Sequence, residues 1–205
     1  MSGLRSVSAA DPAFTPFELV AIGCSAGGLA PLSTLLSSLS RDFPIPVVVV
    51  QHLSATLPSQ LPEVLNFRSA LPCRWAEPGE RPRRGTVLVA PPGTNLVLAE
   101  NGSLARQPGP KPRLGWPSVD LFLESAARAL GPRAIAIVLS GMMHDGAKGI
   151  AAVRRAGGAT MVQHPRSAQF PEMPSAAVDL GRADLLMPPA TIALALDILG
   201  EAGVR

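Results

Sequence analysis

The stretch LVAIGCSAGG, residues 19–28, indicates the fold class of this chain. It begins as an apolar run, turns at Gly23 into a glycine-rich segment, and leads into a leucine-spaced stretch at residues 29–39. An uninterrupted apolar run predicts a strand that is buried on both faces, as in parallel sheets covered by helices. The stretch that follows has the periodicity of a helix. The sequence thus predicts a strand, a tight turn and a helix.

The same alternation recurs along the chain. The run at 47–50 precedes a leucine-spaced segment at 57–65, and the run at 134–139 precedes a helical pattern at 146–156. Further strands are expected at 160–163 and 185–187, and further helices at 191–199 and at 119–130, the latter with Ser118 as its N-cap. Strands that alternate with helices are typical of an α/β fold with a mainly parallel sheet between two helical layers.

The middle of the chain departs from this alternation. Short apolar runs at 86–90, 95–99 and 104–105 are separated by Pro91-Pro92-Gly93 and Asn101-Gly102. These turn signals favour a group of antiparallel strands that interrupts the alternation. Asn101-Gly102 is the strongest hairpin signal in the sequence. The predicted fold is therefore a three-layer, doubly wound, mainly parallel sheet with an antiparallel edge hairpin.

Composition bounds the class of protein. The chain has 205 residues, of which 47% are hydrophobic and 16% charged, and this length suits one domain. Residues 1–16 are expected to be a disordered tail, and residues 17–205 to form the domain. Because no apolar run could span a bilayer and no signal peptide opens the chain, we expect a cytoplasmic protein without membrane insertion. Cys24 and Cys73 are expected to be reduced thiols.

Three reactive side chains follow three of the predicted strands. Ser25 follows the first strand, His52 the second, and Asp145 the strand at 134–139. Because the active sites of open α/β sheets lie beyond the carboxyl ends of the strands, these side chains should meet at one edge of the sheet. Together they form a hydroxyl nucleophile, an imidazole base and a carboxylate that orients the base. The sequence predicts a catalytic triad.

Each of these residues also has a simpler interpretation. Ser25 lies in a G-x-S-x-G-G turn that could be an ordinary strand–helix turn or a phosphate loop, although a dinucleotide fingerprint would have glycine at that position. Cys24 is a rival nucleophile, but adjacent residues near a strand end usually point apart. His52 alone would be structural more often than catalytic, and Asp145 alone could simply start a helix.

The other histidines offer an alternative triad but no metal site. The order Ser25…Asp145…His164 matches common α/β hydrolases, but these usually place the nucleophile after several strands. His164 is therefore assigned to a surface turn before Pro165. His144 remains without a role, and the spacing of the histidines and cysteines predicts neither a metal site nor a cofactor.

Charge is concentrated in the middle third of the chain. Basic residues outnumber acidic ones between residues 66 and 113: Arg68, Arg74, Arg81, Arg83, Arg84, Arg106, Lys111 and Arg113 against Glu77, Glu80 and Glu100. The patch is either a solvated face or a docking face for an acidic partner. Nucleic acid is not supported, because aromatic residues make up only 4% of the chain and tyrosine is absent.

Seven segments in order resemble the CheB-type chemotaxis receptor methylesterases. They are VAIGCSAGG at 20–28, VVQHL at 49–53, VAPPGTNL at 89–96, PSVDLF at 117–122, LSGMMHDGAKG at 139–149, GG at 157–158 and EMPSAA at 172–177. The resemblance covers roughly residues 18–199. Two positions differ from the usual family pattern: Ala26 stands where Thr is common, and Glu172 stands where Gly is common.

The resemblance implies an activity and a site. It implies that Ser25, His52 and Asp145 form the triad, that the backbone N–H of Met142 helps to form the oxyanion hole, and that no cofactor is needed. Family members often carry an N-terminal receiver domain, and because so few residues precede the first strand, control through that domain is expected to be absent from this chain. A separate receiver protein is then a candidate partner in a phosphorelay.

The hypothesis from the sequence is a serine esterase of chemotaxis-type signalling. It would hydrolyse glutamate methyl esters on a methylated chemoreceptor or receptor-like protein, release methanol, and deamidate glutamine as a second activity. Two alternatives stay open: a binding or scaffold module of the same fold without activity, and a general small-ester hydrolase.

Overall fold

A computed structural model describes residues 17–107 and 117–202 and contains a seven-stranded sheet in which all neighbouring strands are parallel. Its order is β3-β4-β2-β1-β7-β8-β9. The strands are β1 (Leu19–Cys24), β2 (Val47–Gln51), β3 (Cys73–Trp75), β4 (Val87–Val89), β7 (Ala134–Val138), β8 (Ala159–Gln163) and β9 (Leu185–Met187). The predicted tail at residues 1–16 lies outside the described residues.

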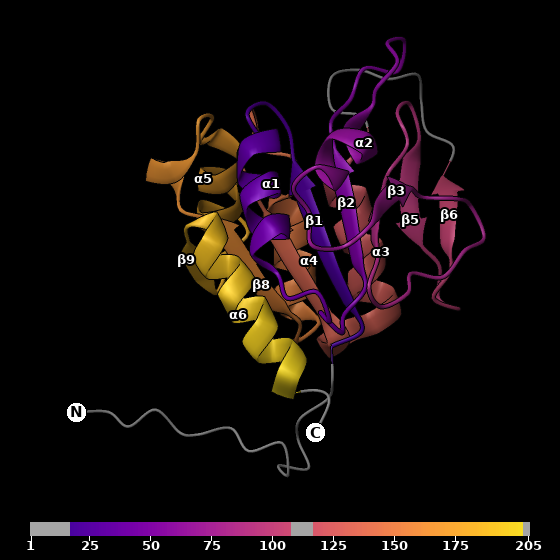
Figure 1. The fold of residues 1–205 in the computed structure, drawn as a ribbon. Helices are drawn as coiled ribbons and strands as arrows, with labels where there is room; N and C mark the ends of the chain where they lie inside the picture. Colours follow the sequence, from indigo (N-terminus) through magenta and orange to yellow (C-terminus); the bar gives the residue numbers. More distant parts are fainter. Residues whose placement is uncertain (1–16, 108–116, 203–205) are drawn as a thin grey trace.

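Helices cover both faces of this sheet, as Figure 1 shows. One face packs against α1 (Leu29–Ser38), α2 (Leu61–Asn66) and α6 (Pro189–Ala202). The other face packs against α3 (Val119–Leu130), α4 (Ala147–Arg155) and α5 (Glu172–Asp179). Alternate residues of β1 enter the two cores, which explains why the strand is apolar throughout. The predicted three-layer, doubly wound fold is confirmed. None of the described helices has the length and apolar character that crossing a membrane requires.

The middle of the chain forms a hairpin that is separate from the main sheet. Strands β5 (Asn95–Leu98) and β6 (Leu104–Gln107) pair in antiparallel fashion around the predicted Asn101-Gly102 turn. The hairpin packs on α3, where the Leu98 N–H donates to the Ser125 hydroxyl. The preceding strand, β4, instead joins the parallel sheet between β3 and β2. Its three residues are all buried, as in the other central strands.

The strand order reverses around β1, which pairs with β2 on one side and β7 on the other. From β2 the sheet continues toward β4 and β3, and from β7 it continues toward β8 and β9. Such a switch point leaves a crevice at the carboxyl ends of the strands. The residues that follow β1, β2 and β7 therefore converge there.

Gly23 lets the start of α3 approach this crevice closely. A Cβ atom at Gly23 would lie 2.1 Å from Cγ1 of Val119, the first residue of α3. No side chain could be accommodated there without displacing Val119. The contact brings the N-terminus of α3 next to the end of β1, and this proximity matters for the site.

Candidate active site

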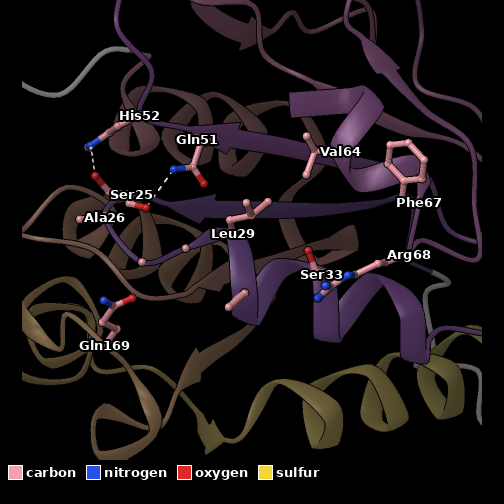
Figure 2. A pocket seen from close by; sticks show the side chains of 13 residues that line it. Ser25, Ala26, Leu29, Ser33, Gln51, His52, Val64, Phe67, Arg68 and Gln169 are labelled. Atoms are coloured by element: carbon pink, nitrogen blue, oxygen red, sulfur yellow. Dashed lines mark hydrogen bonds between the residues drawn. The ribbon is translucent and has the colours of Figure 1, made fainter. Parts of the chain in front are cut away.

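The three side chains predicted from the strand ends lie in direct contact. The Ser25 hydroxyl is 3.0 Å from Nδ1 of His52, and Nε2 of His52 is 2.7 Å from a carboxylate oxygen of Asp145. All three residues are partly buried. The edge of the sheet thus holds a hydroxyl, an imidazole and a carboxylate in one hydrogen-bonded chain. Figure 2 shows the contact between Ser25 and His52 from the side of α1.

The carboxylate fixes the tautomer of the imidazole. Burial raises the pKa of Asp145, but hydrogen bonds from His52 and from two backbone N–H groups outweigh this effect and hold the pKa below its usual value. An ionised carboxylate can only accept, so Nε2 of His52 carries the hydrogen that Asp145 accepts. In a neutral ring Nδ1 is then unprotonated, and it can accept the proton of the Ser25 hydroxyl.

Asp145 is held by the N-terminus of α3. Its two carboxylate oxygens accept from the N–H groups of Val119 and Asp120 at 2.8 Å each. The predicted N-cap Ser118 is confirmed, and its hydroxyl accepts from the third N–H of the helix, that of Leu121. Helix N-termini stabilise negative charge through these free N–H groups. The same contacts that lower the pKa of Asp145 therefore fix its position beside His52.

Asp120 of α3 accepts hydrogen bonds from the N-terminus of α4. One carboxylate oxygen of Asp120 accepts from the N–H groups of Gly146 and Gly149, at 2.9 and 2.8 Å. Both groups lie at the start of α4, where backbone N–H groups have no acceptor within the helix. Burial raises the pKa of Asp120, and the nearby charge of Asp145 adds to this effect against the backbone hydrogen bonds. Each aspartate thus caps the helix of the other. The sequence does not predict this contact of Asp120, since nothing in the pattern shows how closely two helices approach.

Removing the Asp120 carboxylate tests this reciprocal capping. We expect Asp120→Ala to lower the free energy of unfolding by about 1–2 kcal/mol, because the Gly149 N–H loses its acceptor and the Gly146 N–H keeps only the Asp145 carboxylate at 3.1 Å. Turnover should also fall, since the segment that carries Asp145 is loosened. Asp120→Asn keeps one carbonyl acceptor and should lose less. Urea unfolding and initial rates check this, and equal stability of both variants and the wild type would contradict it.

A second group of hydrogen bonds holds the backbone around Ser25. The Gln51 amide donates to the Ser25 carbonyl at 2.9 Å, and the buried Ser140 hydroxyl donates to the Ala26 carbonyl at 2.9 Å. The Cys24 thiol is buried and donates to the Gln51 side chain rather than to His52. Burial raises the pKa of Cys24 to about 12, so this thiol is not a nucleophile at neutral pH. The sequence predicted neither Gln51 nor Ser140.

The loop after β7 passes directly beside Ser25. A Cβ atom at Gly141 would lie 2.8 Å from Cβ of Ser25, so only glycine permits this approach. Among the described residues no acceptor pairs with the backbone N–H of Met142, which follows Gly141. Met143 has a φ of 67°, a left-handed conformation that is strained for this residue type. The Ser25 N–H, by contrast, donates to the Ser140 carbonyl.

Two hollows open on either side of Ser25 and share Ser25, Ala26 and His52. One, of about 760 Å³, lies over α1 and α2 (Figure 2), and the other, of about 750 Å³, lies over the loop between β7 and α4. The second is lined by Met142, Met143, His144 and Lys148 among others. The Ser25 hydroxyl is thus reachable from two directions.

The two other histidines do not contact Ser25, His52 or Asp145 through a hydrogen bond. His164 begins the short turn that contains Pro165, where its side chain accepts from the Arg166 N–H, as expected for a surface turn. His144 lines the second hollow without joining the triad contact. No three histidine, cysteine or acidic side chains gather as metal ligands in the part of the chain that the structure covers.

The fold and this constellation together define a class: doubly wound α/β proteins with a serine, a histidine and an aspartate at the switch point of the sheet. The family model for the CheB methylesterase matches residues 20–196. The chain belongs to the CheB methylesterase family.

Individual relatives agree with this assignment. Over 97% of its length the chain is 40% identical to a protein-glutamate methylesterase/protein-glutamine glutaminase of Cupriavidus metallidurans, and over 92% it is 39% identical to one of Mesorhizobium japonicum. It spans 59% and 55% of those two proteins. The crystal structure of the CheB methylesterase catalytic domain of Thermotoga maritima superposes with a TM-score of 0.82 at 32% identity, covering 90% of this chain and 100% of that domain.

Proposed function

We propose that this chain is a serine esterase that hydrolyses glutamate methyl esters on a chemoreceptor or a receptor-like protein. The observation that carries the proposal is the continuous contact from the Ser25 hydroxyl through His52 to Asp145. The names of the two curated relatives give a protein-glutamate methylesterase activity for those proteins. Chemotaxis-type signalling is the process that such a reaction serves.

The first half of the reaction forms an acyl-enzyme. Ser25 Oγ attacks the ester carbonyl while Nδ1 of His52 takes the hydroxyl proton. The imidazolium is stabilised by Asp145, which accepts from Nε2 throughout. Collapse of the tetrahedral intermediate breaks the bond to the methoxy oxygen, and His52 returns its proton to that oxygen. Methanol leaves, and the glutamyl group remains bound to Ser25.

The second half repeats these steps with water. His52 deprotonates the water as its oxygen attacks the acyl carbonyl, the bond to Ser25 Oγ breaks, and His52 returns the proton to Ser25 Oγ; the released glutamic acid side chain then gives its own proton to solvent. In both halves negative charge develops on the carbonyl oxygen and needs a donor. The backbone N–H of Met142 is the candidate donor, because it has no acceptor among the described residues, whereas that of Ser25 already donates to Ser140.

Deamidation of glutamine follows the same path. An amide presents a carbonyl to Ser25 in the same geometry, and His52 would protonate the leaving nitrogen to release ammonia in place of methanol. The relatives' names include a protein-glutamine glutaminase activity. The reaction therefore needs no further residue in the site.

The substrate class is tested by comparing two esters. Purified protein is incubated with receptor fragments that carry radiolabelled methyl esters, and separately with a small chromogenic ester. We expect kcat/KM for the fragment to exceed that for the small ester by at least about a hundredfold, because the hollows beside Ser25 are larger than one ester group. Equal values would favour a general small-ester hydrolase, and no turnover of either by folded protein would favour a scaffold module.

A further inference from the structure

The hollow over α1 and α2 extends well beyond the reacting group. Its volume of about 760 Å³ is typical of sites that enclose drug-sized ligands, whereas a methylated glutamate side chain is much smaller. The lining begins at Ser25 and His52 and ends at Phe67 and Arg68, just after α2. Figure 2 shows Ser25 and Arg68 at opposite ends. The far end is therefore free to contact residues that flank the ester.

Exposed apolar side chains line the hollow from its middle to its far end. Phe67, at the far end, is 89% exposed, and Val64 of α2 and Leu29 of α1, which lie nearer to Ser25 in Figure 2, are 41% and 42% exposed. All three line the same hollow. Apolar side chains that face an open hollow next to a reactive centre are typical of surfaces that bind a partner.

One cation completes this end of the hollow. Arg68 is exposed and forms no ion pair within the described part of the chain. No aspartate or glutamate lines the hollow, so no carboxylate of the lining offsets the charge of the guanidinium. In Figure 2 the Arg68 side chain extends toward α1, across the hollow. An arginine in this setting is suited to binding a carboxylate.

The other arginines of the basic middle third do not share this position. Arg74 pairs with Glu80. Arg81 lines a hollow with Leu19, at the amino end of β1, and Arg84 lines one with residues that precede β2. Of the basic residues predicted to form a docking face, Arg68 is the described one that lines a hollow with Ser25. Lys111 and Arg113 lie outside the described residues.

We infer that this hollow binds the acidic segment that flanks the ester in the protein substrate. Arg68 binds a carboxylate of that segment, and Leu29, Val64 and Phe67 bind its apolar side chains. The inference rests on the proposed function, because it assigns the substrate's chemistry to the surface beside Ser25. Arg68 thus determines specificity without touching the reacting atoms.

The test uses charge reversal on both partners. Wild-type protein, Arg68→Gln, Arg68→Glu and Phe67→Ser are assayed for methanol release from methylated receptor fragments. A second set of fragments carries lysine in place of each flanking acidic residue, one at a time. Arg128→Gln is the matched control, since Arg128 is also exposed and lines a different hollow with Glu124.

We expect KM for the acidic fragment to rise about tenfold in Arg68→Gln and further in Arg68→Glu, with kcat unchanged, because the ester itself is handled by other residues. Phe67→Ser should raise KM several-fold, and Arg128→Gln should have no effect. One lysine fragment should be a better substrate for Arg68→Glu than for the wild type. Added salt should raise KM of the wild type more than that of Arg68→Gln.

Two different failures can be told apart. If the wild type releases methanol and the Arg68 variants keep its KM, this inference is overturned while the esterase stands. If kcat falls instead of KM, Arg68 acts on the reacting groups and the assignment as a specificity residue is wrong. If the wild type releases no methanol, the proposed function fails and the inference fails with it.

Discussion

Ser25→Ala is expected to lower the rate of ester hydrolysis by about 10⁴- to 10⁶-fold, the loss typical of removing the nucleophile of a triad. The hydroxyl has His52 as its side-chain partner, so the variant loses one hydrogen bond and should remain folded. Initial rates of methanol release, with a thermal unfolding curve for each protein, measure both effects. A variant that unfolds at the wild-type temperature and loses its activity would assign the loss to chemistry.

Cys24→Ala is the neighbouring control. Its thiol is buried and points toward Gln51, and its raised pKa keeps it protonated at neutral pH. We expect the variant to retain activity within about threefold, since nucleophilic attack by cysteine requires the thiolate. The opposite pattern, with activity lost in Cys24→Ala and kept in Ser25→Ala, would exchange the roles of the two residues.

Asp145→Asn is expected to lower kcat by about 10⁴-fold, as replacement of the carboxylate in a triad does elsewhere. The asparagine amide can donate to Nε2 of His52, which selects the tautomer with hydrogen on Nδ1. That nitrogen faces Ser25 and could then no longer accept the hydroxyl proton. Single-turnover rates on the labelled fragment measure the loss. Activity near that of the wild type would show that the carboxylate does not set the tautomer.

The pH dependence of stability tests the structural role of Asp145 separately from its proposed catalytic role. Because folding lowers the pKa of Asp145, its ionised form stabilises the fold above the unfolded pKa, and this contribution is lost as pH falls through the folded pKa. As the pH falls below about 5, the free energy of unfolding should therefore decrease less for Asp145→Asn than for the wild type. Urea unfolding at several pH values checks this, and parallel curves would contradict it.

The fold was largely predictable because buried parallel strands leave a simple pattern. The runs in β1, β2 and β7 are apolar throughout, since both faces of the sheet are covered. The edge strand β3 was missed because its three residues are too few for any pattern. The placement of β4 depends on pairing with distant strands, and the local turn signals around it could not reveal that pairing.

The site was predictable only where one rule applied. The strand-end rule brought Ser25, His52 and Asp145 together, because it needs the order of elements and nothing finer. The support from Asp120 depends on how closely α3 approaches α4, which no local pattern encodes. Arg68 was one of many arginines in the sequence, and its distinction comes from the hollow that it shares with Ser25.

The most direct test of the account is the release of methanol from a methylated receptor fragment by the wild type and by Ser25→Ala, at equal concentrations of folded protein. We expect steady release by the wild type, with a glutamate left in the fragment, and release at the background rate by Ser25→Ala. Equal release by the two proteins would contradict the assignment of Ser25 as the nucleophile. No release by either would contradict the esterase itself.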